Sequence, residues 1–386
     1  MKKLPIAIFL SLLVGLLIVF WPRPAITNSG QASVEWLTAD ELVASGEFAR
    51  VYGPDALVFP RDLGPHEDYQ TEWWYYTGNL ATETGREFGY QLTFFRRGLT
   101  PGKASGTSDW RTNQVYFSHF TISDIENEKF YPHERFSRGA DGLAGAQADA
   151  YRVWLEDWSA EQVAPGQVHL VADAGDVALD LTLTATQPPV LQGDRGYSPK
   201  SDEPGNASYY YSVVQQQTQG TVTIDGTTIP VTGNSWKDHE YSTSALKEGT
   251  VGWDWFSLQL DDGAALMLFA LRNAAETGLN IADGKYVAAD GGETRILPGD
   301  CLVTVGDTWT SPTSGAVYPA QWRIEIPKID LRLEGQPLMA NQELNVSNIY
   351  WEGATTFTGQ LADTPVKAKG YIEMTGYTDT TMAGVL

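Results

Sequence analysis

The chain has 386 residues, a formal net charge of −22 and one cysteine, Cys301. The negative charge argues against nucleic acid or an anionic membrane surface as a partner, since phosphate groups would be repelled. A single thiol excludes an intrachain disulfide and any zinc site built from paired cysteines. Hydrophobic residues make up 42% of the chain, so it can form sizeable cores, and its length suggests two domains.

The N-terminus has the pattern of a membrane-targeting segment. Lys2 and Lys3 precede an uncharged apolar run from Leu4 to Trp21. A basic start followed by an apolar stretch is typical of an export signal, and this run is close to the length that spans a bilayer. We therefore expect residues 1–25 to be either a cleaved signal peptide or a retained anchor. In both cases the body would be exported, to the periplasm or outside the cell, and only this segment would contact a membrane.

Residues 26–54 read as a tether that contains one short helix, 36–45. Thr38 and Glu41 have the spacing of a capping box at its start, and Gly46 stands where such a helix would stop. No long helical periodicity follows this segment.

From Glu72 onward the dominant pattern is that of β-strands, with apolar and aromatic runs separated by turn residues. The first series of expected strands is 72–80, 89–96, 114–125, 151–160, 167–173 and 177–186. The second series is 209–216, 219–233, 253–272, 285–290, 318–327, 329–335, 355–361 and 370–377. Asp225-Gly226 and Asp262-Gly263 each separate two apolar runs, which is a strong signal for a tight hairpin turn.

Several of these runs alternate apolar and polar residues, as expected for strands with one buried face. Between 177 and 184 the residues Val177, Leu179, Leu181 and Leu183 share one face, and polar residues occupy most of the other. Many short strands joined by short turns predict an all-β protein of antiparallel barrels or sandwiches. Two series of similar length predict two such domains, 55–245 and 246–386.

A polar stretch rich in proline, 187–208, interrupts the strand pattern. It predicts a loop, because proline cannot continue a central strand. This loop is either a lid over the mouth of a barrel or an exposed linker without a role.

The segment 233–256 concentrates the residues that could carry chemistry. It contains Trp236, Trp253 and Trp255 together with His239 and several acidic side chains, among them Asp254. Proton donors and acceptors set among large aromatic faces are what a pocket needs to protonate, or simply hold, an apolar and electron-rich molecule.

The segments HEDYQTEWWYYTGNL (66–80) and GNSWKDHEYS…GWDWFSLQLDDGAALMLFALR (233–272) resemble the carotenoid 1,2-hydratase, or hydroxyneurosporene synthase, family of the AttH-like, lipocalin-like superfamily. The resemblance covers about residues 55–380. It implies two tandem lipocalin-like barrels with a ligand site near their junction. It also implies catalytic roles for His239, Tyr241 and Asp254, although tyrosine stands at 241 where the hydratases tend to carry tryptophan.

Hydration of an isolated C=C bond needs an acid, stabilisation of the resulting cation, and water. Asp254 is one candidate acid, because burial among rings raises the pKa of a carboxyl group, and His239 is the other, as acid or as base. Asp238 or Glu240 could orient the imidazole. No cofactor or metal is required.

Strand geometry restricts these assignments, because neighbouring residues point to opposite faces. If His239 faces a cavity, Tyr241 does too, and Asp238 and Glu240 face away. By the same reasoning Asp254 lies on the face opposite its two tryptophan neighbours, unless a bulge redirects it.

Six further side chains are candidates for substrate binding. They are the tryptophans Trp73, Trp74, Trp236, Trp253 and Trp255, and the carboxylate Glu72. In a cavity, the face of a desolvated tryptophan ring could stabilise a cation by about 2 kcal/mol. Each tryptophan could instead belong to the core of a barrel. Glu72 could instead pair with an arginine such as Arg96, since a carboxylate in an apolar strand needs a partner. We expect no metal at His66, which has no second histidine at a suitable spacing.

Two functions are consistent with these features. The first is a cofactor-independent hydratase that acts on an isoprenoid or carotenoid-like substrate. The second is a non-catalytic carrier of a small hydrophobic ligand, which needs only an apolar cavity.

Overall fold

The structure is a computed structural model that describes residues 48–102, 107–244, 249–273 and 279–378. The expected signal or anchor at 1–25 and the expected helix at 36–45 lie outside the described residues. Among the helices that are described, none combines the length and apolar character needed to cross a bilayer.

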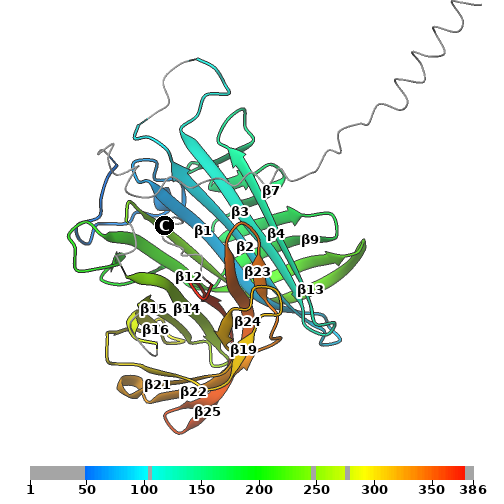
Figure 1. Ribbon diagram of the computed structural model, residues 1–386, viewed down its shortest axis with the longest axis vertical. Coiled ribbons are helices and arrows are strands. Elements are labelled where there is room, and N and C mark those ends of the chain that lie inside the picture. The colour runs from blue at the N-terminus through cyan, green and yellow to red at the C-terminus, as the bar shows by residue number, and fades with distance from the viewer. Residues whose placement is uncertain (1–47, 103–106, 245–248, 274–278, 379–386) are drawn as a thin grey trace, which may run out of the picture. The chain divides into compact units, whose positions relative to one another are not determined.

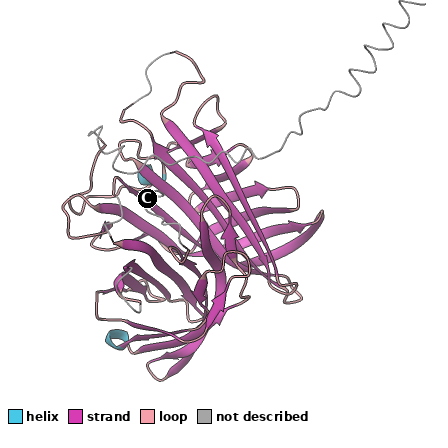
Figure 2. Ribbon diagram, viewed as in Figure 1, coloured by secondary structure: helices cyan, strands magenta, loops and turns pink. Residues whose placement is uncertain are grey.

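The described elements are short 3₁₀ helices and antiparallel strands (Figures 1 and 2). The helices are η1 (Arg61–Leu63) and η2 (Pro327–Ile329). The first sheet is built from β1 (Thr71–Ala81), β2 (Glu87–Gly98), β3 (Gln114–Asp124), β4 (Lys129–Arg138), β5 (Ala144–Gln147), β6 (Arg152–Leu155), β7 (Trp158–Ala164), β8 (Gln167–Asp173), β9 (Val177–Ala185), β10 (Val190–Leu191), β11 (Tyr197–Pro199), β12 (Ala207–Ile224) and β13 (Thr227–Ser242). The second sheet is built from β14 (Thr250–Leu260), β15 (Ala265–Asn273), β16 (Ile281–Val287), β17 (Glu293–Ile296), β18 (Leu302–Val305), β21 (Trp322–Ile326), β22 (Leu331–Pro337), β23 (Glu343–Asn345), β24 (Ile349–Leu361) and β25 (Thr364–Met374). A separate two-stranded ribbon pairs β19 (Thr308–Thr310) with β20 (Val317–Pro319).

The first sheet runs in the order β4-β3-β2-β1-β13-β12-β9-β8-β7-β6-β5, with β10 and β11 added beside β12. Its two long central pairs, β1 with β13 and β13 with β12, join residues far apart in the chain. The sheet curls until β4 and β6 come into contact, so it forms a nearly closed barrel.

The second sheet runs in the order β17-β16-β15-β14-β25-β24-β22-β21-β18, with β23 beside β24, and forms a half-barrel. Contacts of β2 with β24 and of β1 with β25 bring its face against the outer face of the first sheet. In Figure 1 the orange strands β23 and β24 cross the blue and cyan strands of the first sheet.

The described residues form four buried clusters, and the three largest follow from this arrangement. One fills the first barrel, around Trp74, Phe120 and Trp158, and a second fills the half-barrel, around Phe256 and Trp322. A third lies between the two sheets and is described below. The central strands therefore bury both of their faces. An ordinary antiparallel strand instead buries one face and exposes the other to solvent.

The prediction of an all-β chain with two antiparallel, barrel-like sheets is confirmed. Both predicted hairpin turns are present, and Asp225 and Gly226 take the positive φ angles, 47° and 77°, that such a turn needs. The expectation of one strand over 151–160 was wrong. A hairpin turn at Glu156, which has a φ of 57°, divides this segment into β6 and β7. The turn residues are Glu156 and Asp157, without glycine, so the segment lacks the Asp-Gly pair that marked the other two hairpins.

Candidate active site between the two sheets

The central strands of the first sheet present alternate side chains to two different interiors. On β13 the odd-numbered residues Lys237, His239 and Tyr241 point into the barrel. The even-numbered residues Trp236, Asp238 and Glu240 point toward the second sheet. β1 and β12 are in direct register with β13, so the same division applies to them. This alternation places the carboxyl groups of Asp238 and Glu240 in the inter-sheet space.

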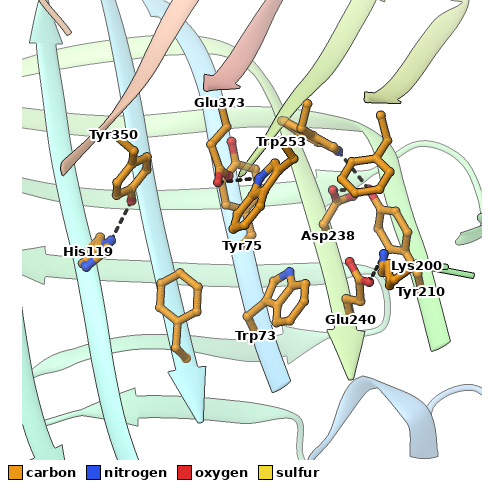
Figure 3. Close-up of a pocket in the computed structure, with 13 residues that line it drawn as sticks. Trp73, Tyr75, His119, Lys200, Tyr210, Asp238, Glu240, Trp253, Tyr350 and Glu373 are labelled. Carbon is orange, nitrogen blue, oxygen red and sulfur yellow. Dashed lines mark hydrogen bonds and ion pairs between the residues drawn. The ribbon is translucent and has the colours of Figure 1, made fainter. Parts of the chain in front are cut away.

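A cavity of about 80 Å³ lies in this space and is partly open to solvent. Aromatic rings from both sheets form most of its wall (Figure 3). The lining residues are Trp73, Tyr75, Phe95, His119, Lys200, Tyr210, Asp238, Glu240, Trp253, Trp255, Phe269, Tyr350 and Glu373. A volume of this size accommodates two or three water molecules, each of about 30 Å³, or the end of a larger molecule.

Asp238 is one of the acidic groups in the cavity. Its Oδ1 accepts hydrogen bonds from Trp236 Nε1 at 2.7 Å and from Ser212 Oγ at 2.5 Å, and its Oδ2 accepts one from the Tyr210 hydroxyl at 2.5 Å. Burial raises the pKa of Asp238 to about 7, although these three donors favour the ionised form. Asp238 can therefore change its protonation state near neutral pH.

Glu373 and Glu352 form a second acidic group on the opposing sheet. They lie directly opposite each other on β25 and β24, so their side chains are neighbours on the same face of the second sheet. Tyr75 donates its hydroxyl to Glu352, and Trp253 Nε1 donates to Glu373 Oε1 at 2.9 Å. Burial raises the pKa of Glu352 well above its ordinary value and that of Glu373 to about 7. Like charges directly opposite on neighbouring strands repel, so ionisation of one carboxyl disfavours ionisation of the other, and both are protonated below the pKa of Glu373.

Glu373 is the member of this pair that meets the cavity. Its side chain is only partly buried, because one side of it faces the hollow, whereas Glu352 is fully buried behind it. Figure 3 shows Glu373 between Tyr75 and Trp253, with Asp238 in the same cavity. The geometry thus places a carboxyl group with a pKa of about 7 against aromatic faces.

The remaining polar groups of the cavity are paired. Lys200 Nζ lies 2.5 Å from Glu240 Oε1 and 4.8 Å above the ring of Phe269. His119 contacts the Tyr350 hydroxyl through Nδ1 at 2.6 Å and Glu134 through Nε2 at 3.0 Å. These pairs hold the walls of the cavity in place.

The structure brings some of the sequence-predicted residues to this cavity. Trp73, Trp253 and Trp255 line it, and Trp236 packs behind it, edge-on to Trp255 at 6.2 Å. Trp74 lies on the opposite face of β1, in the core of the barrel, and donates its Nε1 to the Leu63 carbonyl at 3.1 Å.

His239 and Glu72 do not line the inter-sheet cavity and instead form a buried cluster in the barrel. His239 Nε2 lies 2.8 Å from Glu72 Oε1, and Arg96 Nε donates to Glu72 Oε2 at 2.9 Å. Burial lowers the pKa of His239 to about 4, so the imidazole is neutral. Burial alone would raise the pKa of Glu72, but Arg96 and the two histidines His239 and His66 hold it well below its ordinary value. The expected alternative, an Arg96–Glu72 pair, is what the structure shows.

Tyr241 and Asp254 also lie away from the cavity. Tyr241 stacks on the ring of His66, with centroids 3.6 Å apart. Asp254 points into the half-barrel, where the Tyr377 hydroxyl donates to it at 2.9 Å, and burial raises its pKa to about 7. No bulge redirects Asp254, so strand alternation places it on the face opposite Trp253 and Trp255.

One group of side chains has the composition of a metal site. His66, Glu72 and His239 offer ligand atoms that lie within 4.8 Å of one another, so the fold supplies the second histidine that the sequence around His66 lacks. All three are already hydrogen-bonded, however, and the guanidinium of Arg96 contacts the carboxylate. The cluster is therefore complete as a network of hydrogen bonds, and a cation there would be repelled by Arg96.

Sequence reasoning missed Glu352 and Glu373. Each stands inside an apolar run, IYWEGA and GYIEMT, which is the same signal that singled out Glu72. It also treated Asp238 only as a partner of His239, whereas the structure makes it a cavity residue.

The fold and the site together define a class of protein, in which two antiparallel barrel-like sheets pack face to face and enclose an aromatic, acidic cavity between them. The AttH-like family model matches residues 50–377, and the chain belongs to this family.

Solved structures agree with this assignment. A crystal structure from Nitrosomonas europaea, described as an AttH, is 35% identical, has a TM-score of 0.77, and covers 86% of this chain and 100% of its own. Kievitone hydratase from Nectria haematococca is 14% identical and has a TM-score of 0.65, and the match covers 86% of this chain and 96% of its own. CghA is 15% identical and has a TM-score of 0.51, and the match covers 86% of this chain and 97% of its own. These last two share the fold. Among curated proteins, none matches the sequence.

Proposed function

We propose that the protein binds a hydrophobic, unsaturated molecule of isoprenoid type between its two sheets and adds water across a C=C bond. The observation that carries this proposal is the carboxyl group of Glu373, whose pKa burial raises to about 7, in an aromatic cavity. The fold shared with kievitone hydratase, a hydratase by name, is consistent with it, as is the resemblance of the two sequence segments to the carotenoid hydratases.

The first step is protonation of the alkene. Glu373 gives its proton to one alkene carbon and becomes a carboxylate, which Trp253 Nε1 and the protonated Glu352 stabilise by hydrogen bonds. A pKa near the working pH is what general acid catalysis favours. Glu352 therefore acts through Glu373, as a positioning residue.

The second step is capture of the cation by water. The ring faces of Trp73, Trp253 and Trp255 stabilise the positive carbon, by about 2 kcal/mol for a well-placed desolvated ring. Water enters from the open side of the cavity and adds to this carbon. Its released proton passes to Asp238, and exchange with solvent restores both carboxyl groups. The net change is the addition of one water molecule to the double bond.

The size of the cavity limits how the substrate is held. About 80 Å³ suits the reacting end of an isoprenoid chain and one water molecule, while the rest of the chain lies toward the open side. A terminal double bond is therefore the expected site of reaction.

The test is incubation of the purified protein with lycopene and shorter prenyl alkenes in heavy-oxygen water. Heavy oxygen is expected in an alcohol product, and Glu373→Gln should lower its rate of appearance by about 10²-fold or more, the usual contribution of a general acid. Asp254→Asn removes a buried carboxyl that faces the half-barrel and serves as the matched control. Tight binding without label in the product would refute hydration and favour a carrier.

A further inference from the structure

A second cavity lies on the other side of β13, inside the mouth of the first barrel. Its volume is about 640 Å³, much larger than that of the inter-sheet cavity. The lining residues are Phe59, Pro60, Leu63, Ala148, Asp149, Tyr151, Gln162, Pro165, Gly166, Gln167, Val168, Ala185, Thr186, Gln187, Pro188, Pro189, Val213, Gln216 and Lys237. This volume is in the range of small-molecule sites, and most of the lining side chains are apolar or aromatic.

The start of the proline-rich segment 187–208 forms part of this mouth. Gln187, Pro188 and Pro189 contribute to the wall of the cavity. Residues 187–189 therefore border a barrel mouth, but the expectation of a loop throughout 187–208 was wrong, because this segment also forms β10 and β11 beside β12. The proposed function makes no use of this cavity.

Lys237 is the one ammonium-bearing side chain among the described residues that line the cavity, and it is 2% exposed. No carboxylate pairs with it in the described part of the chain. Its Nζ lies over the rings of Tyr151, Tyr211 and Tyr76 at 4.2, 5.5 and 5.6 Å, and 3.4 Å from the Tyr211 hydroxyl. A buried lysine without an acidic partner is costly in its charged form.

The electrostatic surroundings leave a large fraction of this amine unprotonated at neutral pH. Burial lowers the pKa of Lys237 to about 7. The groups that face it are the three tyrosines and, on the same strand, the neutral His239, behind which Glu72 is held by Arg96. A lysine with such a pKa is a nucleophile at neutral pH, as in lysines that form Schiff bases.

We propose that this cavity binds an apolar aldehyde or ketone and holds it as an imine on Lys237. An apolar acid, the other compound that an amine could select, is disfavoured. Asp149 stands in the cavity wall, the chain carries a net charge of −22, and no second cation is present in the described lining to hold a carboxylate. The carbonyl compound is neutral and suits the apolar wall.

The reaction is a condensation that needs no oxidant or reductant. The lone pair of Nζ attacks the carbonyl carbon, and the C=O π electrons move to the oxygen. Proton transfer from nitrogen to oxygen gives a carbinolamine, which loses water to form the C=N bond. The Tyr211 hydroxyl, whose pKa burial raises well above its ordinary value, stays protonated and accepts a hydrogen bond from Nζ at 3.4 Å, while its Oη also contacts His239 Nδ1 at 3.0 Å. It therefore positions the amine, and the proton lost by the nitrogen leaves with the departing hydroxyl as water.

The test is reductive trapping with decanal and cyanoborohydride on the full chain at neutral pH, followed by peptide mass mapping. We expect Lys237 to be labelled at least about tenfold faster than an ordinary exposed amine, for which Lys367 is the internal reference, because more of its amine is unprotonated. The rate should be half-maximal near pH 7. Labelling of Lys237 no faster than Lys367, or no adduct at Lys237, would overturn the proposal.

Two variants complete the test. Lys237→Met, close in shape to lysine but without an amine, should lose the fast adduct while the slow labelling of exposed lysines remains. Glu373→Gln should keep the fast adduct, so failure of the imine site and failure of the hydratase site are distinguishable. Since the adduct is mapped on the natural protein, the result stands even if Lys237→Met does not fold. If decanoate protected Lys237 from labelling and no decanal were trapped, the cavity would bind an acid, and the proposal of an aldehyde or ketone ligand would be refuted.

Discussion

Replacement of Glu373 by glutamine should make the protein more stable at high pH and remove one part of its pH dependence. Burial raises the pKa of Glu373 from 4.5 to about 7. The folded state therefore binds more protons than the unfolded state between these two values. The free energy of unfolding then falls as the pH rises through this window, and the loss is complete above the folded pKa.

The magnitude follows from the size of the shift. One pKa unit corresponds to about 1.4 kcal/mol, so a rise from 4.5 to about 7 corresponds to at most about 3 kcal/mol between acid and alkaline conditions. Glutamine keeps an acceptor for Trp253 and a donor for Glu352, and it does not ionise. The unfolding free energy of Glu373→Gln minus that of the natural protein should rise by about 2–3 kcal/mol from pH 5 to pH 8.5.

Urea unfolding at intervals of pH, followed by tryptophan fluorescence, measures this difference directly. Because it is a difference between two proteins, the titration of other groups largely cancels. Glu334→Gln on β22, which removes an exposed carboxylate paired with Arg323, is the matched control, and its effect should stay within about 0.5 kcal/mol. A difference for Glu373→Gln that does not change with pH would refute the assignment of a raised pKa to Glu373.

Three further substitutions separate structural from chemical roles. Arg96→Met leaves Glu72 charged, buried and without its cation, and should lower the unfolding free energy in urea by about 3–5 kcal/mol. His239→Ala should lower the midpoint of thermal unfolding, because it opens a cavity next to Trp74, but the folded protein should still incorporate heavy oxygen. Asp254→Asn should leave incorporation within about threefold of the natural rate, since its carboxyl faces the half-barrel, and a loss comparable to that of Glu373→Gln would contradict the assignment.

Much of the fold could be predicted from the sequence because antiparallel strands leave a local record. The alternation at Val177, Leu179, Leu181 and Leu183 and the Asp-Gly turns are short-range patterns, and the structure follows them. β4 was missed because its residues are partly exposed along its length and mostly polar, with no clear alternation. The pairing of β1 with β13 in the middle of the sheet joins residues far apart in the chain, for which a local pattern offers no signal.

Local patterns predicted which residues of the candidate site share a strand face, but not which face lines the cavity. Alternation along β13 correctly separated His239 and Tyr241 from Asp238 and Glu240. It could not tell which set faces the second sheet, because residues 235–242 are buried on both faces and no solvent side marks the strand. Glu373 meets the cavity only through the pairing of β14 with β25, which the sequence around it does not specify.

The buried ionisable groups near β13 fall into two kinds, and the difference indicates which of them serve function. The carboxylate of Glu72 has partners of opposite charge or hydrogen-bond donors on every side: Arg96 contacts it, both histidines bond to it, and its pKa falls.

Glu373 and Lys237 have no such partner of opposite charge among the described residues. Burial raises the pKa of Glu373 and lowers the pKa of Lys237, in both cases to about 7. Each therefore destabilises the fold in its ionised form, which a purely structural role does not require. Each also faces a cavity. A group that lowers stability, titrates near neutral pH and contacts an enclosed space is the kind that proteins retain at reactive sites. For this reason the two proposals above rest on Glu373 and Lys237 and not on the His239–Glu72 cluster.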